Sequence, residues 1–121
     1  MKRDSVLSLV GIAKKAGRIA AGEFQTEQAV KAGKAHLVLI STDASQNTKK
    51  KFRNMCIFYE VPVALYSTKE ELGMAVGCEA RASLAVLDRG LADSIYGKLP
   101  LAESENQMRD GGRADGENQG A

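Results

Sequence analysis

The sequence predicts an α/β fold, a three-layer α/β/α sandwich with a small mixed sheet of about four strands and about five helices. Short continuous apolar runs alternate along the chain with segments whose apolar residues recur every three or four positions. The first pattern is typical of strands covered on both faces, and the second of amphipathic helices. Capping residues and glycines stand at many of the junctions. A chain of 121 residues has room for one such layered domain.

The first half of the chain is predicted to open with a helix, because apolar residues at helical spacing follow a capping residue. Asp4 or Ser5 can cap this helix, and Gly17 can end it. A continuous apolar run later in this half is typical of a strand buried on both faces. The predicted elements are a helix at 5–17, an extended stretch at 18–21, a helix at 23–33 and a strand at 36–41.

The second half repeats this alternation. Its first helix has a basic early surface and an apolar later face. Pro62 suits the start of a strand or an edge strand. Ser67 or Thr68, followed by Glu70 or Glu71, forms a capping-box pattern that opens a further helix. The predicted elements are a helix at 46–59, a strand at 61–66, a helix ending near 76, a strand at 82–88 and a last helix containing Leu91, Ile95 and Leu99.

The net charge of +2 conceals two parts of opposite sign. Residues 1–99 carry fifteen basic and ten acidic side chains, which gives +5, and we expect them to form the single functional domain. Residues 100–121 carry two basic and five acidic side chains, which gives −3, with four glycines and few large apolar residues. Such a segment cannot bury enough apolar surface to offset its ordering entropy, so we expect a disordered acidic tail.

Several functional classes lack their sequence signatures. No apolar run approaches the roughly 18 residues of a membrane span. Cys56 and Cys78 are 22 positions apart with a single histidine, His36, in the chain, which argues against a metal site and a disulfide scaffold. No phosphate-binding, dinucleotide-binding or nucleophile-elbow motif is found. We therefore expect a cytoplasmic protein that is not an enzyme and that has no cofactor and no membrane partner.

Basic side chains near loops favour a polyanionic partner, with nucleic acid as the leading candidate. Gly22 ends an extended stretch and opens a helix, where backbone N–H groups and the helix dipole favour anions. Polar side chains in the first turns could contact base edges, although an ordinary tight turn followed by surface residues gives the same pattern. The candidate contacts of this region are Lys14, Lys15, Arg18, Gly22, Glu23, Gln25, Thr26, Gln28, Lys31 and Lys34.

A second candidate segment joins the helix that ends at Gly77 to the next strand. Small residues allow a loop to approach a ligand closely, and one arginine can contact a phosphate; a plain surface connection is the alternative. The segment consists of Cys78, Glu79, Ala80, Arg81 and Ala82.

These segments carry a resemblance to a known family. The sequence from about residue 4 to 98 resembles the ribosomal protein L7Ae family of kink-turn RNA-binding proteins, and within it the bacterial YlxQ-like branch. The resemblance implies an α/β/α sandwich that binds structured RNA. The matching blocks are Gly22-x-x-Gln25-Thr26-x-Gln28, Lys34 to Ile40, Asp43-Ala44-Ser45, Val61-Pro62-Val63, Lys69 to Gly77 and Ala82-x-x-Ala85-Val86.

The resemblance also implies where RNA would bind. The family's motif at this helix start is Gly-x-Asn-Glu-x-x-Lys, whose polar side chains read the sheared G·A pairs of the kink. Its glycine falls on Gly22, but Phe24, Gln25 and Gln28 occupy the asparagine, glutamate and lysine positions. Phe24 could stack on an unpaired base or pack inward. The loop at 78–82 matches the family loop that covers the flipped-out nucleotide.

Two functional hypotheses remain open. In the first, the protein is a non-catalytic binder of structured RNA, such as a kink-turn or ribosomal RNA, with possible association with the ribosome or another ribonucleoprotein. In the second, it is a protein-interaction or dimerisation module that has kept the fold and lost kink-turn readout. The burial of Phe24 bears on the choice, since an exposed Phe24 could anchor a partner protein and a buried one could not.

Overall fold

The computed structural model describes residues 4–100, within which the chain forms five helices and four strands. The predicted acidic tail lies outside the described residues from position 101 onward. In chain order the elements are α1 (Ser5–Lys15), β1 (Ile19–Ala21), α2 (Glu23–Lys31), β2 (Leu37–Ile40), α3 (Gln46–Tyr59), β3 (Val63–Leu65), α4 (Lys69–Ala75), β4 (Ser83–Val86) and α5 (Arg89–Lys98).

The four strands form one mixed sheet in the order β1-β4-β2-β3. Strand β4 pairs antiparallel with both β1 and β2, whereas β2 and β3 are parallel. Strands β1 and β3 are therefore the two edges. Pro62 lies just before edge strand β3, in agreement with the expectation for this residue.

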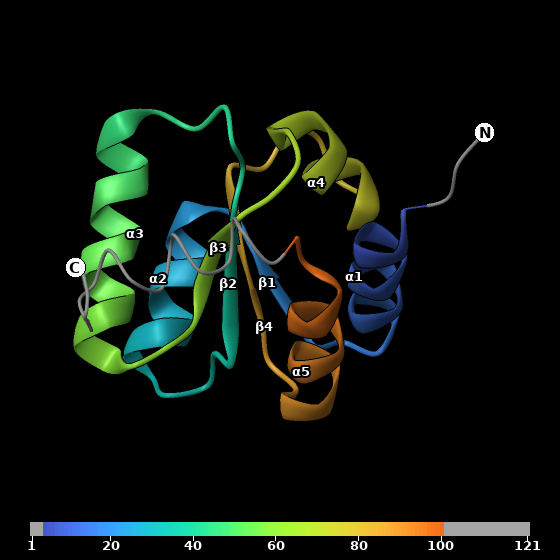
Figure 1. The fold of residues 1–121 in the computed structure, drawn as a ribbon, viewed down its shortest axis with the longest axis horizontal. Coiled ribbons are helices and arrows are strands. Elements are labelled where there is room, and N and C mark those ends of the chain that lie inside the picture. Colours follow the sequence, from blue (N-terminus) through green and yellow to red (C-terminus); the bar gives the residue numbers. More distant parts are fainter. Residues whose placement is uncertain (1–3, 101–121) are drawn as a thin grey trace.

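Helices cover both faces of the sheet (Figure 1). Helices α2 and α3 lie on one face, and α1, α4 and α5 lie on the other. Strand β2 shows why: Leu37 and Leu39 belong to the core under α1, α4 and α5, whereas Val38 and Ile40 belong to the core under α2 and α3. Alternate residues of a strand point to opposite faces, so a fully apolar strand needs a cover on each side. The predicted three-layer sandwich is confirmed.

Side chains at the helix starts explain where several elements begin. Asp4, Ser45, Thr68 and Asp88 each accept a hydrogen bond from a backbone N–H in the first turn of α1, α3, α4 and α5. The caps Asp4 and Thr68 agree with the sequence prediction, whereas Asp88 falls at the end of a predicted strand. Strand β4 in fact ends at Val86, because Asp88 already turns the chain into α5.

None of the helices in residues 4–100 has the length and apolar character needed to cross a membrane.

Candidate nucleic-acid interface

Two segments far apart in the sequence meet at the start of α2. The β1–α2 junction at Gly22 and the loop before β4 together line an open hollow of about 420 Å³. Both segments lie at the same end of the sheet because β1 and β4 are antiparallel neighbours, with Ala21 opposite Leu84. The hollow is lined by Ala21, Gly22, Glu23, Phe24, Gln25, Ala80, Arg81 and Ala82.

The loop before β4 is held against α4 by a close backbone approach. A Cβ atom added to Gly73 would lie 2.0 Å from the carbonyl oxygen of Glu79, which is well inside van der Waals contact. The N–H of Arg81 also donates to the carbonyl of Lys69 at 2.9 Å. The loop therefore depends on a glycine in the middle of α4. The sequence contained this signal, since Gly73 lies within the Lys69 to Gly77 block, but the close approach itself was not predicted.

The side chain of Arg81 closes one side of the hollow. Its guanidinium donates to the carbonyl of Ala80 at 2.9 Å and, more weakly, to that of Glu79 at 3.4 Å. Its Cδ and Nε atoms lie 3.7 Å from the position where a Cβ of Gly22 would be. Arg81 thus brings a positive charge, already held by its own loop, next to the start of α2.

Gly22 adopts a conformation that favours glycine, with φ of 98°. It is the N-cap of α2, and no side chain caps this helix. The N–H of Gly22 itself is not available to a ligand, because it donates to the carbonyl of Ser83 at 2.9 Å. Any backbone donors offered to an anion here are therefore those of the first helical turn.

A second hollow, of about 320 Å³, continues along α2 from the first. Gln25 lines both hollows, and Gln28 and Lys34 line the second. The floor includes Leu87, whose N–H donates to the carbonyl of the exposed Arg18 at 2.8 Å. The structure thus brings Arg81, Gln25, Gln28 and Lys34 onto one surface that follows α2, and the backbone of the exposed Arg18 lies at its edge, bonded to Leu87.

Phe24 is exposed on this surface, with 67% of the residue accessible. It lines the first hollow instead of packing into the core. An aromatic ring of this size has a large apolar face and gains little by remaining in water. Phe24 is consequently available to a ligand, which leaves both base stacking and the anchoring of a partner protein open.

The Thr26 side chain is part of the packed interior and is not exposed at the surface. It is fully buried, its hydroxyl is 3.5 Å from the carbonyl oxygen of Ala20, and the hydroxyl of Ser83 lies 3.4 Å from it. The expectation that Thr26 contacts RNA is corrected by this burial. On a helix, residues four apart share a face, and Thr26 shares the buried face with Val30.

Glu23 and Lys31 belong to an ion-pair network between α2 and α3. Lys51 of α3 lies 2.9 Å from carboxylate oxygens of both Glu23 and Glu27, and Lys31 lies 2.8 Å from Glu27. Hydrogen bonds from Lys31 and Lys51 lower the pKa of Glu27 from 4.5 to about 2. Lys31 is therefore paired on the side of α2 that faces α3, and is not gathered with Gln25 and Lys34. Glu23 lines the first hollow while its carboxylate is held by Lys51.

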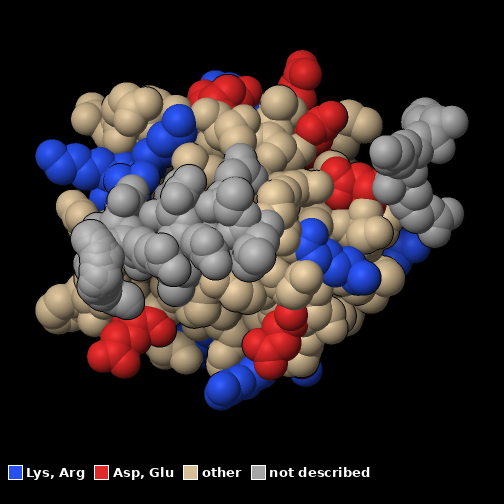
Figure 2. All heavy atoms as spheres, in the orientation of Figure 1, with Lys and Arg blue, Asp and Glu red and all other residues tan. Residues whose placement is uncertain are grey.

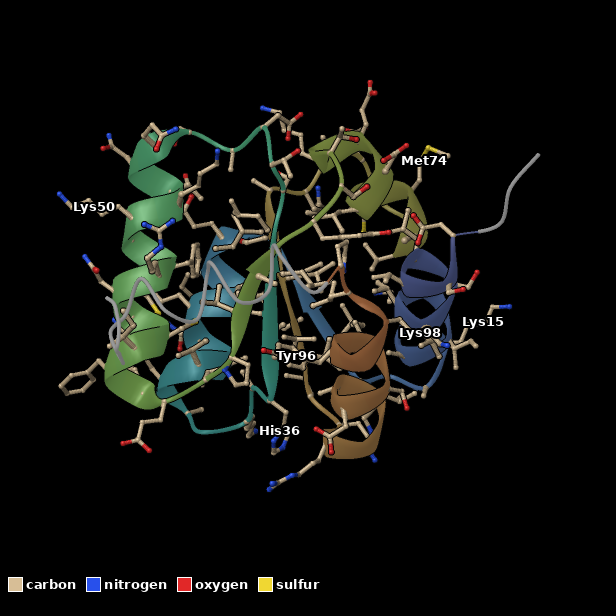
Figure 3. All side chains as sticks on the ribbon, viewed as in Figure 1. Lys15, His36, Lys50, Met74, Tyr96 and Lys98 are labelled. Atoms are coloured by element: carbon tan, nitrogen blue, oxygen red, sulfur yellow. The ribbon has the colours of Figure 1, made fainter. Side chains whose placement is uncertain are left out.

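The remaining predicted contacts lie elsewhere. Lys14 and Lys15 are in the last turn of α1, where cations stabilise the negative end of the helix dipole. Figure 3 places Lys15 at the outer side of the layer opposite α2, pointing away from the sheet. Cys78 packs against the core under α1, α4 and α5, and Glu79 contributes its backbone to the contact with Gly73. Of the predicted loop, Ala80, Arg81 and Ala82 line the hollow.

No arrangement for metal binding is found within residues 4–100, where no three histidine, cysteine or acidic side chains are grouped together. Cys56 is buried between α3 and the sheet, and this burial raises the pKa of its thiol to about 12. Such a thiol is a core side chain and not a nucleophile. His36 is half-buried just before β2, and in Figure 3 it lies at one end of the sheet.

Comparison with known proteins agrees with this fold. Curated relatives named "RNA-binding protein YlxQ" are 36% identical in Bacillus subtilis (strain 168) and 33% identical in Enterococcus faecium. These matches cover 75% and 74% of this chain, and 91% and 86% of the two relatives.

Solved structures with the same fold include a protein with unknown function from Bacillus halodurans C, with a TM-score of 0.76, 35% identity, and coverage of 78% of this chain and 96% of that one. A Giardia lamblia 15.5kD RNA binding protein has a TM-score of 0.69 at 23% identity, covering 81% of this chain and 90% of that one, which is a likeness of fold. The model of the Ribosomal protein L7Ae/L30e/S12e/Gadd45 family matches residues 4–111. The chain therefore belongs to this family and resembles its RNA-binding YlxQ members.

Proposed function

We propose that this protein is a non-catalytic binder of structured RNA. The observation that carries the proposal is the meeting of the Gly22 junction with the Ala80–Ala82 segment around one hollow, which continues along α2. Membership of a family with RNA-binding relatives supports the same function.

Three cations at the rim of this surface supply the phosphate contacts in our proposal. Arg81 lies beside the first hollow, Lys34 lines the second, and Arg18 is exposed next to the floor of the second. Phosphate contacts position a protein on RNA, and contacts to bases specify the sequence.

Base contacts fall to the side chains between these cations. Phe24 offers a face for one unstacked base, and the amides of Gln25 and Gln28 can both donate to and accept from base edges. The small side chains of Ala80 and Ala82 leave room for a base to enter the hollow.

A kink-turn is the RNA class that we propose first, because the family resemblance maps its recognition onto Gly22 and the loop at 78–82. In this chain Phe24 replaces the family's asparagine, and Gln28 replaces its lysine. We infer an RNA-binding protein that tolerates variation at the G·A pairs and relies more on base stacking than the family pattern does.

Binding of this kind also fits association with the ribosome or another ribonucleoprotein, in a reducing cytoplasm where Cys56 and Cys78 stay free.

A second candidate function is a protein-interaction or dimerisation module. The exposure of Phe24 at 67% is the specific observation in its favour, since an exposed aromatic side chain beside a hollow is also a suitable anchor for a partner protein.

Ultraviolet crosslinking in cells, followed by sequencing of the bound RNA and mapping of the crosslinked peptides, tests the proposal. We expect enrichment of structured RNAs and crosslinks in the peptides that contain Phe24 or Arg81. A double variant, Phe24→Ala with Arg81→Ala, is the control and is expected to lose most of the crosslinked RNA. Recovery of no RNA above the level of an untagged strain would refute RNA binding and favour the protein-interaction module.

A further inference from the structure

The outer face of α3 is a basic surface that the predicted binding site does not include. Helix α3 carries four basic side chains, Lys49, Lys50, Lys51 and Arg53, and no acidic one. Figure 2 shows basic side chains gathered over the first half of α3, at the left of the view. In Figure 3, Lys50 points outward from α3, away from the sheet.

The lysines of α3 differ in whether they form ion pairs. Lys51 is bound to the carboxylates of Glu23 and Glu27 on α2. Lys49 and Lys50 form no ion pair within residues 4–100. The two acidic side chains of α2 are already engaged by Lys31 and Lys51, so they do not offset the charge of Lys49 and Lys50 directly. The first half of α3 therefore keeps an uncompensated positive surface.

Amide side chains accompany Lys50 on the exposed face of α3, whereas Lys49 is half-buried and lies to one side of that face. Asn47, Lys50 and Asn54 are spaced at i, i+3 and i+7, which places them on one side of the helix, and all three are exposed. Amide N–H groups and lysine ammonium groups are both donors to phosphate oxygens. The exposed apolar side chains Ile57 and Phe58 are confined to the other end of α3, about two turns further along.

Helix α3 adjoins the proposed RNA-binding site through Lys51. Glu23 lines the first hollow, and its carboxylate is 2.9 Å from Lys51 of α3. Helices α2 and α3 share one core cluster, with Val30 of α2 and Phe52 of α3 in it, which holds the outer face of α3 in a fixed position relative to α2. An RNA helix that leaves the hollow across α2 would next meet α3.

We propose that Lys50, with Asn47 and Asn54 beside it and Lys49 at its edge, forms a second contact surface for the sugar–phosphate backbone of the same RNA. This inference rests on the proposed function and extends it to the helical stem beyond the recognised element. The contacts add affinity and fix the direction in which the stem leaves, and they read no sequence because they reach phosphates only.

Salt-dependent affinity tests this second surface. The probes are a synthetic kink-turn RNA with a duplex stem on each side and a plain RNA duplex of the same length. The test variant is Lys49→Ala with Lys50→Ala. The control variant is Lys15→Ala with Lys98→Ala, which removes the same charge from the opposite layer, where Figure 3 shows both residues.

We expect the slope of log affinity against log salt to fall by about 1.4 to 1.8 for the test variant, which corresponds to two lost phosphate contacts at about 0.7 to 0.9 each. The control variant should keep the wild-type slope. A wild-type slope in the test variant, or an equal loss in both variants, would overturn the inference. If Phe24→Ala loses binding and the test variant binds as the wild type does, the second contact surface is refuted and the proposed function stands. If the wild-type protein binds neither RNA, the proposed function is refuted as well.

Discussion

At the scale of single residues, the candidate site depends on a glycine that does not line the hollow it shapes. Gly73 is buried in α4, and the carbonyl of Glu79 occupies the space where a side chain would begin. This contact sets how near the loop with Arg81 comes to α4, and hence the width of the hollow beside Gly22. The role of Gly73 is therefore one of backbone approach, not of chain flexibility, because it has no positive φ.

The first prediction concerns Gly73→Ala. In a helix interior, alanine is favoured over glycine by up to about 1 kcal/mol. Here the methyl group would meet backbone atoms at 2.0 and 2.6 Å, and such overpacking costs about 1–3 kcal/mol. We therefore expect a net loss of stability, measured by urea unfolding, together with weaker RNA binding because the loop is displaced.

Gly97→Ala provides the matched control. Gly97 lies in α5, and nothing lies within 4 Å of its added Cβ. This variant should be more stable than the wild type by about 0.5–1 kcal/mol, because only the helix preference changes. If Gly73→Ala were stabilised to the same extent as Gly97→Ala, the close approach of the loop would not be a constraint on the fold.

A second residue-scale prediction concerns the two free cysteines. Burial raises the pKa of the Cys56 thiol to about 12 and keeps reagents away from its sulfur, whereas Cys78 is half-buried in the loop before β4. Alkylation by iodoacetamide at pH 8 should thus modify Cys78 in the folded protein and Cys56 only after unfolding. Mass spectrometry of peptides from native and urea-treated protein checks this order, and rapid native labelling of Cys56 would contradict it.

At the scale of elements, α2 has two surfaces with different tasks. On one side, Glu23 and Glu27 form ion pairs with Lys51 of α3, and Lys31 forms an ion pair with Glu27. The other side, with Gln25 and Gln28, lines the hollows, and Glu23 at the helix start borders the first of them as well. The sequence predicted α2 and its polar character, but the helical register alone could not say which polar residues face a neighbouring helix. Lys31 is paired with Glu27 on the side facing α3, and Thr26 is buried against Ala20 and Ser83 of the sheet; neither packing contact can be read from the sequence alone.

The ion pairs between α2 and α3 predict a pH dependence. The pKa of Glu27 falls from 4.5 to about 2 on folding. A lowered folded-state pKa gives stabilisation that is fully present above the unfolded value and is lost as pH falls from about 4.5 through about 2. The wild type should therefore exceed Glu27→Gln in urea midpoint near pH 7, and the difference should vanish near pH 2.

Salt provides the internal control for this comparison. The pairs are partly exposed, so the difference between wild type and Glu27→Gln at pH 7 should shrink in 1 M salt. A difference that persists unchanged down to pH 2 would mean that Glu27 stabilises the helices through packing and not through its charge.

At the scale of the whole molecule, the sequence is sufficient to predict the layers of the fold but not the arrangement of residues on the candidate binding surface. Apolar runs such as residues 37–40 define buried strands, because both faces of the sheet must be covered. Those signals are local in the sequence, and so the fold class was predictable. The meeting of Gly22 with Arg81 was implied by family resemblance, but the hollow between them depends on strand order and on Gly73. The separation of Lys15 from the site and the outward basic face of α3 follow from packing between distant elements, which no local pattern contains.

The central claim, that the surface around Gly22 binds RNA through Phe24, is tested most directly by comparing two exposed aromatic residues. Phe24 is 67% exposed beside the hollow, and Phe58 is 78% exposed near the end of α3. Neither ring is part of a buried cluster, so both Phe24→Ala and Phe58→Ala should leave the thermal midpoint nearly unchanged.

The measurement is the affinity of each variant for the kink-turn RNA, by fluorescence anisotropy at fixed salt. We predict that Phe24→Ala loses about 1–3 kcal/mol of binding, roughly 5- to 150-fold, as expected for one lost base stack, and that Phe58→Ala binds as the wild type does. Equal affinities of the two variants would contradict the claim.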